Sequence, residues 1–330
     1  MTSFIKAQRA ARTFLRGLDK KDILSIVRIG SSLRREDFVD GSDIDFLIIQ
    51  KKRPRDFMEH GMQGEFEINV VRRGKREFLS LLKKGIPLDL IAVSYGRLVY
   101  GPGFFASVGN GPWKPKKATV RQWMRTGLFQ LTDAVMAHQH PIDCRSYFRL
   151  VHHSSREFCR AIIAKEKGVI VEGDWRILSI LKEKHTILYR NFRLIVEGRK
   201  KCASFSPRQK NSPFIAKSGR GKYLLAAEEI AHEALRICSG VNFPKANDIV
   251  KIIMQRHPVR EFYAFTLHPE SNEMLLFLKL EGSKLCGFCY NAKNKKNKEI
   301  GKKIARASTI FFGILFKISF YALGSIVQFK

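Results

Sequence analysis

The sequence lacks the cysteine framework of a secreted, disulfide-rich protein, and we expect no signal peptide. We therefore expect a cytoplasmic protein in a reducing compartment. The thiols of Cys286 and Cys289 are expected to be buried or incidental. A structural zinc site is also disfavoured, because the single Cys-x-x-Cys at 286–289 has no second pair of Cys or His with metal-ligand spacing nearby. The six cysteines are Cys144, Cys159, Cys202, Cys238, Cys286 and Cys289.

Acidic residues are scarce, with 30 Asp and Glu against 60 Lys and Arg, which gives a net charge of +30. The imbalance is uneven: residues 1–110 carry a net charge of +7 and residues 111–330 carry +23. Such an excess favours polyanionic partners such as RNA, DNA or an acidic membrane surface. A solvated basic surface adapted to high salt or high temperature is the alternative, since no known RNA-binding motif accompanies the charge.

Charged residues are nearly absent from residues 307–329, where Lys317 is the only one. The length of this segment suffices to cross a bilayer, and the Lys/Asn-rich run at 291–306 would lie on the cytoplasmic side. Lys317 in mid-segment and several hydroxyl residues oppose that interpretation. A C-terminal membrane anchor, a helix packed on the rest of the protein and a divergent end of little function stay open.

The most informative motif joins a Gly-Ser pair to an Asp-x-Asp. Gly30 and Ser31 end one apolar strand, and Asp43 and Asp45 begin the next. Strand alternation places both carboxylates on one face, with Ile44 in the core. Two adjacent carboxylates repel each other unless a cation lies between them, and Mg²⁺ prefers such ligands together with substrate phosphates. Small residues at the Gly-Ser turn let backbone amides reach a phosphate. Turn and cap roles for the same residues are the structural alternative.

This motif resembles that of the polymerase-beta-like nucleotidyltransferase superfamily, over residues 20–102. The resemblance implies one or two Mg²⁺ held by Asp43 and Asp45, which are then also catalytic, and an NTP as substrate, with ATP favoured. It assigns nucleotide binding to Gly30, Ser31, Ser32, Arg34 and Ser42.

The same resemblance implies a third carboxylate on a neighbouring strand. Residues 64–71 alternate with a period of two, so that Glu65, Glu67 and Asn69 share one face. Glu67 is the first choice, as general base toward the acceptor. Asp89 is the rival, although the dipole of a helix beginning at Pro87 also explains an acid there. If neither Glu67 nor Asp89 acts as the third acid, the site would bind nucleotide and metal but transfer the nucleotide poorly.

We predict an α+β protein with a nucleotidyltransferase domain at 1–106, a linker at 107–117, a helical bundle at 118–256 and a C-terminal extension of uncertain structure at 257–330. Within the first domain a helix is expected over 3–18, a strand over 23–27, a helix beginning at Ser31 and another over 75–84. Bundle helices are expected at 118–138, 143–167, 175–184, 221–239 and 246–256.

The layout of the helical half resembles HEPN domains and the helical half of kanamycin-type nucleotidyltransferases. HEPN ribonucleases carry an Arg and a His at a spacing that Arg145 and His152 match. The alternative, favoured because basic residues abound here, is one exposed charge and one half-buried helix residue.

The expected activity is transfer of NMP from an NTP to a hydroxyl acceptor, with release of pyrophosphate. An RNA end, a protein side chain and a small antibiotic hydroxyl all fit the catalytic motif, and the positive charge favours RNA or an RNA-binding partner. A catalytically idle module that binds nucleotide and nucleic acid, and a HEPN-like ribonuclease, are the alternative functions. The sequence does not determine the oligomeric state.

Overall fold

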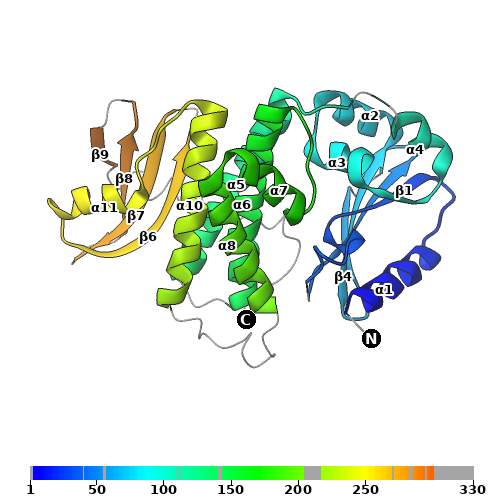
Figure 1. Cartoon of the computed structure of the whole chain (residues 1–330), viewed down its shortest axis with the longest axis horizontal. Helices are drawn as coiled ribbons and strands as arrows, with labels where there is room; N and C mark the ends of the chain where they lie inside the picture. Colours follow the sequence, from blue (N-terminus) through cyan, green and yellow to red (C-terminus); the bar gives the residue numbers. More distant parts are fainter. Residues whose placement is uncertain are drawn as a thin grey trace.

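The computed structural model describes residues 3–39, 41–54, 57–109, 111, 113–139, 143–203, 217–269, 271–281, 285–293 and 296–300. The chain forms a mixed sheet, a group of helices and a second sheet, which follow one another along the longest axis of the molecule (Figure 1). The α+β class predicted from the sequence is thereby confirmed.

The N-terminal sheet has five strands in the order β3-β4-β2-β1-β5. Strands β2 and β4 are parallel and the other neighbours are antiparallel. Its elements are α1 (Ser3–Gly17), β1 (Ile23–Ile29), β2 (Ile44–Gln50), β3 (Met58–Gln63), β4 (Phe66–Gly74), α2 (Lys75–Lys84), α3 (Pro87–Tyr95), β5 (Arg97–Tyr100) and α4 (Pro102–Gly109).

Strand β2 is apolar on both faces because each face of the sheet is covered. Ile44, Phe46 and Ile48 belong to the layer that packs against the amphipathic helix α1. Leu47 and Ile49 point to the opposite face, where α2, α3 and the central helices lie. Strand alternation therefore turns Asp45, two residues before Leu47, toward the central helices.

The central helices are α5 (Lys117–Gln139), α6 (Cys144–Lys167), α7 (Asp174–Lys184), α8 (Thr186–Ala203) and α10 (Lys217–Ser239). Helix α6 lies among the others and is buried along most of its length (Figure 1). Asp143 caps its N-terminus by accepting a hydrogen bond from the Ser146 amide at 2.9 Å. Gly168, in the left-handed conformation, ends it.

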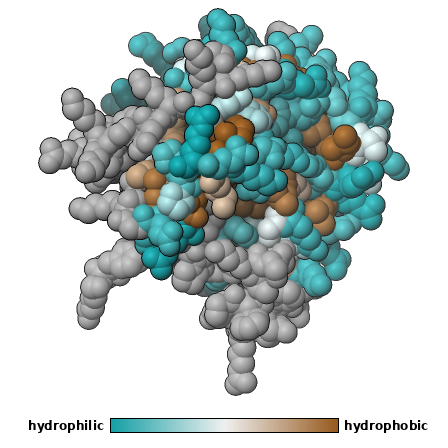
Figure 2. Space-filling model, turned by 90° about the vertical axis from the view of Figure 1, so that its left-hand side faces the viewer, coloured by the Kyte–Doolittle hydropathy of each residue, from teal (hydrophilic) through white to brown (hydrophobic). Residues whose placement is uncertain are grey.

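The C-terminal part is an antiparallel sheet of β6 (Val259–His268), β7 (Glu273–Leu280), β8 (Leu285–Asn291) and β9 (Lys296–Ile300), preceded by α11 (Ala246–Met254). The sheet presents its inner side chains to the apolar core, and this end of the molecule shows hydrophobic groups between hydrophilic ones (Figure 2). On α11 the exposed hydrophobic residues are Ile252 and Met254.

Several predicted elements agree with the structure and others need correction. The helices over 3–18 and 75–84 and the five bundle helices are confirmed to within a few residues. Instead of the predicted helix beginning at Ser31, a 3-10 turn of three residues spans Ser31–Leu33. Residues 107–109 belong to α4 instead of the linker, and helix α8 was not predicted. Strands β6 to β9 form a sheet that was not predicted either, and its last strand, Lys296–Ile300, lies in the Lys/Asn-rich run.

One apolar cluster runs from Val27 in β1 through the central helices to Tyr290 in β8. The division of the chain at 106, 118 and 256 therefore stays a prediction. None of the helices that the structure describes is long and apolar enough to span a bilayer, and the segment 307–329 lies outside the described residues.

Candidate active site

Asp43, Asp45 and Asn69 meet at the N-terminal end of β2. The parallel register of β2 and β4 sets Asp45 beside Asn69. The Asn69 side-chain amide donates to Asp43 Oδ2 at 3.0 Å and to Asp45 Oδ1 at 3.1 Å. Asn69 Oδ1 lies 2.7 Å from His60 Nδ1 on β3, which fixes the orientation of the amide. The two predicted carboxylates therefore share one face and one hydrogen-bond donor.

The carboxylate pair carries more negative charge than its surroundings can stabilise. Burial, and then the charge of Asp43, raise the pKa of Asp45 to about 8, against the opposing influence of the Asn69 hydrogen bond, Arg156 and Arg149. Without a cation between them, both groups cannot be ionised at neutral pH at low cost. This electrostatic conflict and the oxygen donors fit a divalent cation such as Mg²⁺.

Gly30 allows the turn after β1 to approach the pair closely. Its φ of 78° is in the region that favours glycine, and a Cβ there would lie 2.5 Å from Asp45 Oδ2. The Gly-Ser motif and the Asp-x-Asp motif are thus in direct contact, as the sequence prediction requires.

The predicted phosphate-binding residues have different surroundings. Ser31 is half-buried, and among the described residues its hydroxyl has no hydrogen-bond partner. Ser32 is fully buried, and its hydroxyl accepts from Arg28 Nε at 3.1 Å. Ser42 accepts from the Val39 amide at 3.1 Å, which holds the turn before Asp43. Arg34 donates to Asp37 Oδ2 at 2.8 Å. Gly30 and Ser31 thus stay available to a ligand, whereas Ser32 and Ser42 already have intramolecular partners. Arg34 is bound to Asp37 through Nε, and within the described part of the chain its buried Nη2 has no hydrogen-bond partner.

Neither candidate for the third acid contacts the pair. Glu67 is half-buried on the same face of β4 as Asn69, and in the described part of the chain it has no hydrogen-bond or ion-pair partner. Asp89 is fully buried, 3.8 Å from Arg73 Nε at the far end of β4. Its burial raises its pKa to about 6. Because Arg73 lies four residues beyond Asn69 in β4, the position of Asp89 rules it out as a ligand shared with Asp43 and Asp45.

The central helices add arginines that the sequence analysis did not assign to the site. Arg149 of α6 approaches Asp43, with 3.4 Å between Nη2 and Oδ2. Arg145, one turn earlier, donates to the Gly41 carbonyl in the turn before Asp43. No local pattern identifies these two among 60 basic residues, since their role depends on how α6 docks onto the sheet.

A pocket lies between Val39, the residues 41–43 and helices α6 and α8. Its polar lining consists of Ser42, Asp43, Arg145, Arg149, His153 and Arg199. No group of three or more His, Cys, Asp and Glu that could hold a metal occurs within the described ranges. A cation on Asp43 and Asp45 would therefore complete its coordination with substrate and water.

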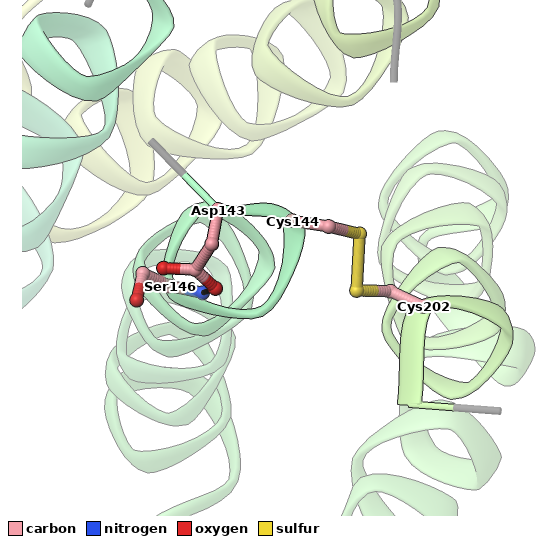
Figure 3. The surroundings of a disulfide bond; sticks show 4 residues. All are labelled: Asp143, Cys144, Ser146 and Cys202. Carbon is pink, nitrogen blue, oxygen red and sulfur yellow. Dashed lines mark hydrogen bonds between the residues drawn. A yellow bond between two sulfur atoms is a disulfide. The ribbon is translucent and has the colours of Figure 1, made fainter. Parts of the chain in front are cut away.

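A disulfide joins Cys144, at the start of α6, to Cys202, near the end of α8 (Figure 3). The sequence analysis, which expected a reducing cytosol, did not predict this bond. The antiparallel packing of α6 and α8 brings together residues 58 positions apart, with 6.4 Å between the Cα atoms. Cys202 also lines the pocket.

His152 is buried in the helical core instead of half-buried. Its Nε2 lies 2.9 Å from Asp174 Oδ2, and burial lowers its pKa to about 4. The Asp174 amide in turn donates to Asp37 Oδ1 at 3.2 Å, which ties α7 to the segment that precedes Asp43. Arg145 and His152 thus have separate structural partners, and the HEPN-like pairing has no support in this geometry.

A mixed sheet with a Gly-Ser turn against an Asp-x-Asp pair is the arrangement expected of a nucleotidyltransferase. No known family model matches this chain, and no curated protein is similar to it in sequence. Several solved structures are similar to it. One is a nucleotidyltransferase-like protein from Exiguobacterium sibiricum 255-15, with 11% identity and a TM-score of 0.32, covering 78% of this chain and 81% of that one.

The second similar structure is the spectinomycin adenyltransferase AAD(9) from Enterococcus faecialis, solved with ATP and spectinomycin. It has 13% identity and a TM-score of 0.43, and the match covers 70% of this chain and 98% of that one. The first is described as nucleotidyltransferase-like and the second as an adenyltransferase.

Proposed function

We propose that this protein is a Mg²⁺-dependent nucleotidyltransferase that moves NMP from an NTP, with ATP favoured, to a hydroxyl acceptor. The observation that carries the proposal is the contact of Asp43 and Asp45 with one Asn69 amide, directly beside Gly30. When bound by the two aspartates, Mg²⁺ would neutralise charge on the phosphates. Gly30 and Ser31 then offer backbone amides and a hydroxyl to the phosphate chain.

The protein groups contribute mainly by positioning and electrostatic stabilisation. Asn69 holds the two carboxylates in one orientation, and Arg149 balances part of their charge. Glu67, on the same face of β4, is the proposed base that accepts the proton of the acceptor hydroxyl. The hydroxyl attacks the α-phosphorus, the bond to the bridging oxygen breaks, and pyrophosphate leaves.

The test is incorporation of α-labelled ATP, CTP, GTP and UTP in the presence of Mg²⁺, with total RNA, lysate protein and the enzyme itself as acceptors. Asp43→Asn and Asp45→Asn should each abolish labelling, while Asp22→Asn, an exposed aspartate before β1, should keep it. The labelled fraction identifies an RNA end or a protein side chain as acceptor. Full labelling by both site variants would refute the proposal.

A second function is favoured by one observation: Asn69, a neutral amide, occupies the position on β4 that lies against the carboxylate pair. A site without a third acid at that position suits a module that binds nucleotide without transferring it. Binding of ATP to the wild type, together with no label in any fraction, would support this module instead of the transferase.

A further inference from the structure

Helices α6 and α8 present three arginines to the pocket beside Asp43. Arg145 and Arg149 lie one turn apart on α6, and Arg199 lies near the end of α8. Among the lining residues that the structure describes, Asp43 is the one acidic group, and together with the three arginines these described groups carry a net charge of +2. A pocket with this charge attracts anions and repels polycations.

Arg199 is the least satisfied of the three. It is half-buried, and within the described part of the protein it has no hydrogen-bond or ion-pair partner. Burial and the nearby charges of Arg156 and Arg149 lower its pKa, against the attraction of Asp174 and Asp43. A guanidinium held in this way, with its donors unused, is costly until an anion accepts its hydrogen bonds.

The other two arginines contact the turn before Asp43 and Asp43 itself. Arg145 donates to the Gly41 carbonyl, and Gly41 has no room for a side chain because its Cβ would collide with the Arg145 guanidinium. Arg149 Nη2 lies 3.4 Å from Asp43 Oδ2, a long contact that leaves its other donors available. His153 is uncharged at neutral pH, because burial and the surrounding arginines lower its pKa well below the usual value.

We propose that this pocket is a phosphate subsite in which Arg199, with Arg149, binds a phosphate group next to the aspartate pair. This inference rests on the proposed function and adds the residues that would bind a substrate phosphate. Planar guanidinium groups bind phosphate oxygens with paired hydrogen bonds, which an ammonium group cannot match. The phosphate comes from one of two sources, the terminal phosphates of the NTP or a phosphate on the acceptor.

The test compares Arg199→Gln with wild type in equilibrium binding of ATP, AMP and inorganic pyrophosphate, and of short oligoribonucleotides with a 5′-phosphate or a 5′-hydroxyl. Arg190→Gln is the matched control, because Arg190 is an exposed arginine on the same helix. Loss of a charge-assisted phosphate contact should weaken binding about tenfold or more. Arg199→Lys should recover only part of the affinity. Because Arg199 has no partner to lose, the melting temperature of Arg199→Gln should not fall.

The ligands distinguish the two sources. Weaker binding of ATP and pyrophosphate with unchanged AMP identifies the terminal phosphates of the NTP. Unchanged ATP with weaker binding of the 5′-phosphorylated oligonucleotide alone identifies an acceptor phosphate. If Arg199→Gln binds every probe as wild type does, the subsite is refuted.

Failure of the subsite can be separated from failure of the proposed function. Arginine-dependent phosphate binding without label transfer by the wild type would leave the subsite standing and refute the transferase. Label transfer that requires Asp43, together with wild-type binding of every probe by Arg199→Gln, would support the transferase and refute the subsite.

Discussion

Replacement of Asp45 by Asn should stabilise the protein in the absence of metal, although it should abolish transfer. The folded state keeps a proton on Asp45 up to a pH of about 8, whereas the unfolded chain releases it near the ordinary value of 3.8. The native state therefore binds more protons between these two values, and stability falls as pH rises through this window. Asparagine keeps the shape of the side chain and can still accept from Asn69.

The size of the effect follows from the shift in pKa. Each pH unit above 3.8 costs the native state about 1.4 kcal/mol until the folded pKa is reached. At pH 7 this gives an upper limit of about 4 kcal/mol, and we expect a gain of about 2–4 kcal/mol for Asp45→Asn. At pH 5 the gain should shrink to about 1–2 kcal/mol, since less of the window has been crossed.

Urea denaturation at pH 5 and pH 7, with a chelator present, measures the difference in free energy of unfolding between Asp45→Asn and wild type at each pH. Asp22→Asn, at an exposed position, is the control. Adding Mg²⁺ should raise the stability of the wild type and leave Asp45→Asn almost unchanged, because a ligand that binds only the folded state stabilises it. A variant less stable than wild type at pH 7, or a difference that does not depend on pH, would show that the carboxylate is not under electrostatic strain.

Two further predictions concern the turn and the disulfide. Gly30→Ala should destabilise the protein by about 1–3 kcal/mol, because of the positive φ and the 2.5 Å approach to Asp45 Oδ2. Gly17→Ala, with nothing within 4 Å, is the control, and equal melting temperatures for the two variants would contradict the argument. Joint replacement of Cys144 and Cys202 by Ser should cost about 4 kcal/mol by denaturation, given their separation of 58 residues. Wild type under strong reductant should match that variant, and no loss in either would refute a stabilising bond.

The local periodicity of the sequence determined much of the first sheet and its site. Asp43 and Asp45 flank Ile44, so a strand alone places both on one face, and the Gly-Ser turn at the end of β1 is equally local. The stripes of α1 and α2 and the long helices α5 and α6 also follow from short-range spacing of apolar residues. These features depend on neighbours within a few positions, which the sequence displays directly.

The residues that contact Asp43 and Asp45 come from segments that are distant in the sequence. Glu67 and Asn69 share a face of β4, and only the parallel register with β2 selects Asn69 as the residue beside Asp45. Arg149 reaches Asp43 from 106 positions away. Its basic side chain resembles dozens of others in the chain, so no sequence pattern distinguishes it.

The second sheet and α8 were missed for a related reason. In α8 and in residues 285–300, many basic residues interrupt short apolar patterns. Such patterns predict a helix or a strand only when one face is known to pack on the core, as Phe192 of α8 and Phe288 of β8 do. The disulfide likewise depends on the antiparallel packing of α6 and α8. The sequence by itself determined the Gly-Ser and Asp-x-Asp motif and the class of fold. Tertiary packing decided what surrounds that motif, because charge and proximity in the pocket arise from segments that meet only in the folded chain.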